Sequence, residues 1–77
     1  MPTDLLADPY NVVCPFNEIQ ISILRALADG RLRKTIARDM DITKHYLDVM
    51  ISRMLIRMKA SNTTHLVAIA LRSAWIE

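Results

Sequence analysis

Hydrophobic residues recur at steps of three and four positions over residues 43–59, which places them on one face of an α-helix. This face consists of Leu47, Met50, Ile51, Met54, Leu55 and Met58. At about 100° per residue, the opposite face consists of His45, Asp48, Val49, Ser52, Arg53 and Ile56. We therefore predict an amphipathic helix whose first set joins a core, while the second set is available for function.

Two helices are predicted before this one. Asn17 and Gln20 have the spacing of a capping box, and a hydrophobic stripe after them ends at Gly30, a residue suited to a left-handed C-cap. This predicts a helix over residues 18–29. A shorter helix over 33–40 is expected to bury its apolar positions and to turn its basic side chains, Arg33, Lys34 and Arg38, toward water.

Only a tight turn separates the second helix from the helix over 43–59, and Thr43 is a good N-cap for the latter. A short helix, a tight turn and a longer amphipathic helix form a helix-turn-helix candidate. Thr63 or Thr64 is expected to cap a last helix over 63–75. The sequence thus predicts an all-α domain of four helices over residues 16–77.

Residues 1–15 contain three prolines and no sustained hydrophobic period, which predicts an extended N-terminal arm that lies on the domain surface or covers a seam. The arm lacks the basic start of a signal peptide, and no apolar run reaches the roughly 18–20 residues of a membrane span. A lone Cys14 excludes an internal disulfide and fits a reducing compartment. We expect a cytoplasmic protein that does not enter a membrane.

Charge is distributed unevenly along the chain. Residues 1–30 carry a net charge of −3, whereas residues 31–59 hold eight Lys and Arg against three Asp, a net charge of +5. A basic block of this kind is typical of a protein that binds a polyanion, although a solvated helix surface would give the same count. His45 and His65 have no Cys or carboxylate at metal-ligand spacing, and no phosphate loop or paired-carboxylate motif is present. We therefore expect no enzyme, metal or cofactor.

The last predicted helix is apolar nearly all round, with consecutive hydrophobic residues over 66–71. A terminal helix of a small domain cannot bury every side within its own chain, so part of its surface is expected to meet a partner. A homodimer is the simplest expectation. The alternative is that the N-terminal arm covers the spare face. The predicted dimer contact consists of Leu66, Ile69, Ala70 and Ser73.

Three segments carry a resemblance to a known family: ILRALADG over 23–30, KTIARDMDIT over 34–43 and NTTHLVAIALRSAWI over 62–76. In these segments the chain resembles the LuxR/GerE-type helix-turn-helix domain of bacterial transcription regulators. The resemblance implies a four-helix fold, operator binding by the third helix and dimerisation through the fourth. Lys34 stands where the family commonly has a Lys that contacts the DNA backbone. The chain departs from the family at Leu32, Tyr46, Asp48 and Met50, where Ser, Thr, Lys and His are usual.

The sequence therefore predicts a small dimeric regulator, of bacterial or phage origin, that binds double-stranded DNA with its third helix in the major groove. The predicted DNA-binding residues are Arg33, Lys34, Lys44, His45, Asp48, Val49, Ser52 and Arg53. Asp48 could accept a hydrogen bond from a cytosine amino group, and Val49 could touch a thymine methyl group. The alternative hypothesis is an antagonist that uses the same fold to bind a transcription regulator or a polymerase subunit. It is motivated by four residues on the expected DNA face: Tyr46, Asp48, Val49 and Ile56.

Overall fold

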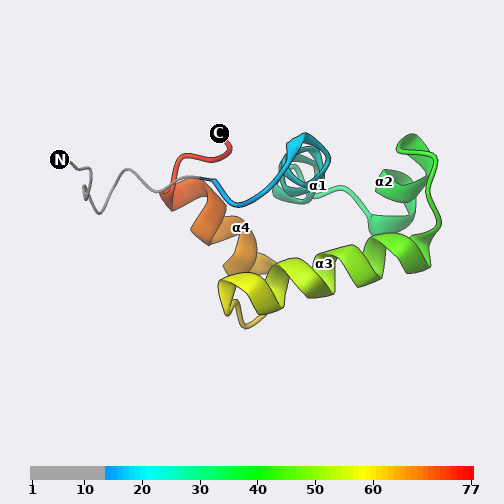
Figure 1. The fold of residues 1–77 in the computed structure, drawn as a ribbon. Helices are drawn as coiled ribbons and strands as arrows, with labels where there is room; N and C mark the ends of the chain where they lie inside the picture. The colour runs from blue at the N-terminus through cyan, green and yellow to red at the C-terminus, as the bar shows by residue number, and fades with distance from the viewer. Residues whose placement is uncertain (1–13) are drawn as a thin grey trace, which may run out of the picture.

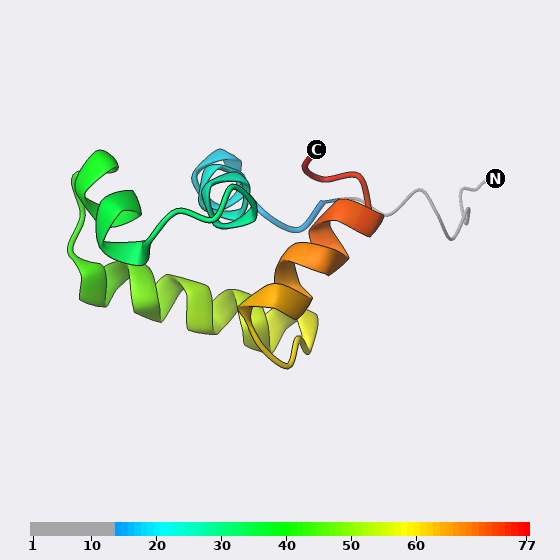
Figure 2. The same ribbon diagram turned by 180° about the vertical axis from the view of Figure 1, so that it is seen from behind.

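Four helices make up the domain in a computed structural model that describes residues 14–77. Helix α3 runs lengthwise along one side, α1 and α2 lie across it, and α4 rises from its C-terminal end (Figures 1 and 2). Their bounds are α1 Glu18–Ala28, α2 Arg33–Asp39, α3 Lys44–Met58 and α4 Thr63–Arg72. The all-α, four-helix prediction is confirmed, except that α4 ends three residues before the predicted position 75. The predicted arm lies outside the described residues apart from Cys14 and Pro15, which are not helical.

Buried side chains form two clusters, and α3 contributes to both. One cluster joins α1, α2 and the N-terminal half of α3; it consists of Ile23, Ile36, Ala37, Leu47 and Ile51. The other joins α1, α4, the C-terminal half of α3 and the chain end; it consists of Phe16, Leu24, Met54, Leu66, Ala70 and Ile76. Fully burying one such large aliphatic side chain stabilises the fold by about 1.5–3 kcal/mol. The core therefore positions α3 along most of its length.

The predicted inner face of α3 is confirmed. Leu47, Ile51 and Met54 are buried, and Met50 and Met58 are partly buried against the two clusters. This arrangement leaves the opposite side of α3 directed outward.

Side-chain caps begin three of the four helices. The backbone N–H of Gln20 donates to Asn17 Oδ1 at 2.9 Å, and the N–H of Asn17 donates to Gln20 Oε1 at 2.9 Å, which completes the predicted capping box. Thr43 Oγ1 accepts from the N–H of Tyr46 at 3.0 Å, also as predicted. The prediction that Thr63 or Thr64 caps α4 is wrong, because Asn62 Oδ1 accepts from the N–H of His65 at 2.8 Å.

All four helices end in the same backbone motif. A residue in the left-handed region follows each helix: Gly30, Asp41, Lys59 and Ala74, with φ of 80°, 57°, 54° and 59°. In each case the next N–H donates to a carbonyl five residues back, at 2.9–3.1 Å. This is the hydrogen bond of a Schellman C-cap. The C-cap predicted at Gly30 is thus one of four.

Candidate nucleic-acid interface

Helix α3 follows α2 after a short turn, which is the arrangement of a helix-turn-helix unit. The outward side of α3 carries most of the predicted DNA-binding residues. His45, Ser52 and Arg53 are exposed on this side, whereas Asp48 and Val49 are partly exposed. Lys34 is exposed on α2. The predicted DNA-binding residues therefore share one region, built from the first turn of α2 and the outer side of α3.

An ion-pair network occupies the part of this region nearest α2. Arg33 Nη1 donates to Asp48 Oδ1 at 2.8 Å, and Lys44 Nζ donates to Asp48 Oδ2 at 2.9 Å. The second terminal nitrogen of Arg33 donates to Thr63 Oγ1 at 3.0 Å. The expectation that Arg33 points to water is therefore wrong. Its guanidinium group is drawn to the Asp48 carboxylate and links α2, α3 and the first residue of α4.

The two cations favour the ionised form of Asp48. The hydrogen bond from Arg33 is the main reason that the pKa of Asp48 lies below its ordinary value of 3.8, and the hydrogen bond from Lys44 lowers it further. An ionised carboxylate only accepts hydrogen bonds, and each oxygen of Asp48 already accepts one from within the chain. Each oxygen can accept a second hydrogen bond, so a cytosine amino group would share an oxygen with Arg33 or Lys44.

A second group of cations, on α2 and at the C-terminal end of α3, has no such partner. No ion pair involving Lys34, Arg53, Arg57 or Lys59 is found among residues 14–77. Arg57 and Lys59 were not among the predicted site residues. Their position in and just after the last turn of a basic amphipathic helix was the sequence signal that could have identified them.

Large hydrophobic side chains are also exposed in the region. Ile56 is 77% exposed on α3, and Tyr46 is 55% exposed near the start of the same helix. Leu32, at the start of α2, is 66% exposed and makes no side-chain cap. The outer side of α3 thus combines cationic and apolar groups.

A comparison with protein families identifies the helix-turn-helix unit. The sequence profile of the GerE family, described as bacterial regulatory proteins of the luxR family, matches residues 17–70. The chain belongs to this family. The match extends from the N-cap of α1 to Ala70 in α4, and it makes the chain a GerE-type DNA-binding regulatory domain. Searches of curated proteins and of solved structures found no match.

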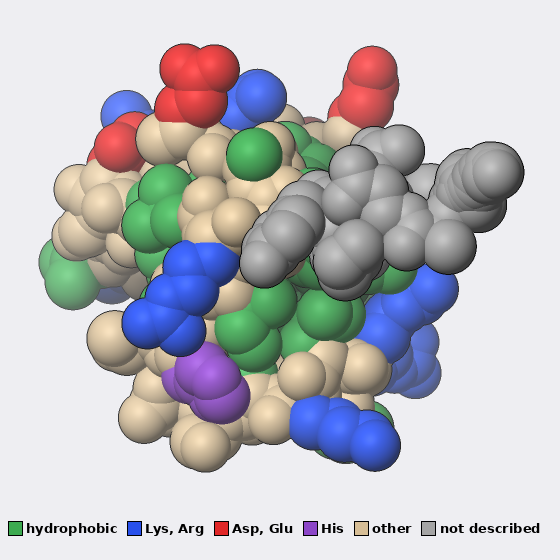
Figure 3. Space-filling model, turned by 90° about the vertical axis from the view of Figure 1, so that its left-hand side faces the viewer, with side chains coloured by type: hydrophobic (Ala, Val, Ile, Leu, Met, Phe, Trp, Pro, Cys, Tyr) green, Lys and Arg blue, Asp and Glu red, His purple; other side chains and the backbone are tan. Residues whose placement is uncertain are grey.

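The exposed side of α4 in the GerE-type domain contains only part of the predicted dimer contact. Leu66 and Ala70 are fully buried in the chain's own core, so the assignment of these two residues to a partner contact is corrected. Ile69 and Ser73 remain partly exposed, and Leu71, which was not predicted, is 46% exposed. Seen from the side of α4 and the C-terminus, hydrophobic side chains lie in the middle of the face, with Lys and Arg side chains to the left and lower right and acidic side chains along the top (Figure 3).

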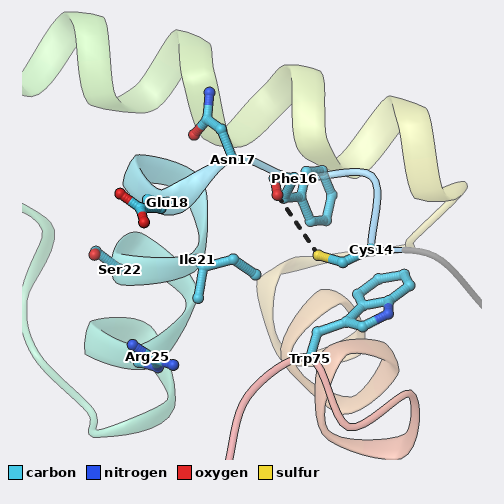
Figure 4. A pocket seen from close by; sticks show the side chains of 8 residues that line it. All are labelled: Cys14, Phe16, Asn17, Glu18, Ile21, Ser22, Arg25 and Trp75. Carbon is cyan, nitrogen blue, oxygen red and sulfur yellow. Dashed lines mark hydrogen bonds between the residues drawn. The ribbon is translucent and has the colours of Figure 1, made fainter.

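A separate pocket of about 460 Å³ lies between α1 and the C-terminal segment. Cys14, Phe16 and Trp75 lie close together at one end, whereas Glu18 and Arg25 lie along α1 (Figure 4). Phe16 and Trp75 meet edge to face at 5.9 Å, and Cys14 Sγ donates to the Phe16 carbonyl at 3.7 Å. The pocket lies outside the helix-turn-helix unit.

Neither a metal cluster nor a membrane helix is found in residues 14–77. No three His, Cys, Asp or Glu side chains gather there as metal ligands, and no helix has the length and hydropathy of a membrane span. His65 is half-buried, and its Nδ1 accepts from the N–H of Ser61 at 2.9 Å. This bond joins His65, in the first turn of α4, to the loop that precedes the helix.

Proposed function

We propose that this GerE-type domain regulates transcription by binding double-stranded DNA with α3 in the major groove. The observation that carries the proposal is the group of cations without ion-pair partners in residues 14–77, located on α2 and around the C-terminal half of α3. Lys34, Arg53, Arg57 and Lys59 would neutralise phosphates. His45, Val49 and Ser52 would face base edges, where a hydroxyl group donates or accepts and an apolar side chain meets a thymine methyl group.

A salt titration on random-sequence duplex DNA tests this proposal. Four neutralised phosphates predict a log–log slope of about −3.6 per subunit, and binding should be measurable at about 50 mM salt. Arg53→Ala should make the slope shallower by about 0.9. Arg25→Ala is the matched control, because Arg25 is an exposed arginine on α1 and away from α3. Absence of any DNA complex at high micromolar protein would overturn the proposal.

A second candidate function is an antagonist that binds a protein of the transcription machinery. The observation that favours it is Ile56, which is 77% exposed on the same helix as the exposed side chains of Arg53 and Arg57. Ile56→Ser distinguishes the two functions. DNA binding should change little if phosphates are the main contact, whereas an antagonist should lose its protein partner. Co-purification of wild type and variant, with protein and nucleic acid both measured, provides the comparison.

We also propose that the domain forms a homodimer through the exposed side of α4. Leu71 is the most exposed large hydrophobic residue of this helix, and Ile69 adds a partly exposed one. Leu71→Glu should give a folded monomer by light scattering. Thr64→Glu, at another exposed position on α4, should leave the dimer mass unchanged. An unchanged mass in Leu71→Glu, or a wild-type monomer, would exclude this interface.

A further inference from the structure

We infer that Asp48 is a positioning residue that withholds Arg33 and Lys44 from DNA phosphates. The inference rests on the proposed DNA-binding function and concerns which cations of the site do the binding. Both withheld residues belong to the region that the sequence predicts to bind DNA, so the basic charge of the region overstates the number of groups free to bind phosphate.

The geometry of the network carries this inference. Each oxygen of the Asp48 carboxylate accepts from a different cation, Arg33 at 2.8 Å and Lys44 at 2.9 Å. Each terminal nitrogen of Arg33 makes one hydrogen bond, because the second donates to Thr63 Oγ1 at 3.0 Å. A phosphate that approached Arg33 would compete with the Asp48 carboxylate for the guanidinium group and would be repelled by its charge.

Burial makes the two arms of the network unequal. The side chain of Arg33 is 35% exposed and that of Asp48 33%, whereas that of Lys44 is 59% exposed. Solvent screens the Lys44 arm more than the Arg33 arm, so Lys44 is the cation that DNA would recruit more easily. Removing the negative charge of Asp48 would release both.

The variant Asp48→Asn tests the inference, because it keeps the size of the side chain and removes its charge. We expect a salt slope steeper by up to about 1.8, one 0.9 step for each released cation, and binding roughly tenfold tighter at about 50 mM salt. Asp39→Asn is the matched control: Asp39 also lies between two cations, Arg31 at 3.0 Å and Arg38 at 3.7 Å, and its loss changes the net charge equally. Asp39→Asn should steepen the salt slope by much less than Asp48→Asn does.

A double-mutant cycle separates release of Lys44 from simple loss of repulsion between Asp48 and phosphate. Lys44→Met should leave the slope of the wild-type chain nearly unchanged, while in the Asp48→Asn background it should make the slope shallower by about 0.9. Equal effects of Lys44→Met in the two backgrounds would overturn the inference. So would an Asp48→Asn variant that binds no more tightly than wild type.

Two further outcomes are informative. If Asp48→Asn does not fold, Lys44→Met in the wild-type chain still tests the inference, because a slope change as large as that of Lys34→Met would mean that Lys44 already binds phosphate. If neither wild type nor Asp48→Asn binds DNA, the proposed function itself fails. Wild-type binding with an unchanged Asp48→Asn slope refutes only the role of Asp48.

Discussion

The two halves of α3 have similar inner faces and different outer faces. Residues 44–51 bury Leu47 and Ile51 against α2, and residues 52–58 bury Met54 against α4. Outside, the N-terminal half carries a carboxylate whose two oxygens are bound by Arg33 and Lys44. In the C-terminal half and directly after it, residues 14–77 provide no ion-pair partner for the cations.

This difference shows that the count of basic residues on a helix does not measure the charge available to a ligand. Arg33 and Arg53 are both candidate phosphate contacts by sequence, but only Arg33 has a carboxylate within 2.8 Å. Attraction for DNA should therefore be weaker at the N-terminal end of α3 than at its C-terminal end. Variants in the inner faces that the halves share, and in the outer faces that differ, test this contrast.

The largest effect should come from the core. Leu47→Ala and Met54→Ala should each lower the free energy of unfolding by about 2–5 kcal/mol, because both side chains are almost fully buried. Urea unfolding followed by circular dichroism measures this loss. Ile56→Ala, on the exposed side of the same helix, is the control and should cost less than about 0.5 kcal/mol. A small loss in only one of the two core variants would mean that the halves are not stabilised equally.

Next in size is the contrast between the outer faces. The double variant Arg53→Ala/Arg57→Ala should bind duplex DNA roughly ten- to a hundredfold more weakly at about 50 mM salt, with a slope shallower by about 1.8. Lys44→Ala should change the slope much less, because its ammonium group is paired with Asp48. Equal slope changes per charge removed in the two halves would break the comparison.

A smaller effect is expected from the cap of the N-terminal half. Thr43→Ala removes the hydrogen bond from the N–H of Tyr46 and should cost about 1 kcal/mol of stability. Thermal unfolding detects a change of this size. Thr64→Ala, at an exposed position in α4 with no cap bond, should stay within about 0.5 kcal/mol of wild type. Similar losses in both variants would argue against a capping role for Thr43.

The smallest effect concerns pH. Because the pKa of Asp48 is lowered in the folded chain, its ion pairs contribute stability above its ordinary pKa of 3.8, and this contribution is lost as the pH falls through the lowered value. The urea midpoint of wild type should exceed that of Asp48→Asn at pH 7, and the two midpoints should converge below about pH 3.8. A difference that persists at lower pH would have another origin.

The elements of the fold could be predicted from the sequence because local patterns determine them. The inner face of α3 follows from hydrophobic spacing, and the caps at Asn17 and Thr43 follow from residue type. The cap of α4 was misplaced because Asn62, Thr63 and Thr64 are adjacent and chemically suitable. In the structure Asn62 is the residue at the N-cap.

The parts of the site that were mispredicted depend on how helices pack. Arg33 and Asp48 are 15 positions apart, and their ion pair depends on the angle at which α2 meets α3. In the same way, α4 is apolar on several sides, so its sequence does not indicate that Leu66 and Ala70 face inward while Leu71 faces outward. Periodicity identifies an apolar helix but does not determine its rotation when most of its sides are apolar.

The repeated C-cap has a consequence for the tolerance of the domain to change. Only Gly30 among the four left-handed residues avoids the steric cost of a Cβ atom, so Asp41, Lys59 and Ala74 adopt this conformation at a cost that the backbone hydrogen bonds of the C-cap offset. Glycine at any of the three positions should remove this cost and so raise the free energy of unfolding of a domain with a small core. A substitution to glycine there would therefore offset the stability lost through a destabilising substitution elsewhere, including one on the outer side of α3.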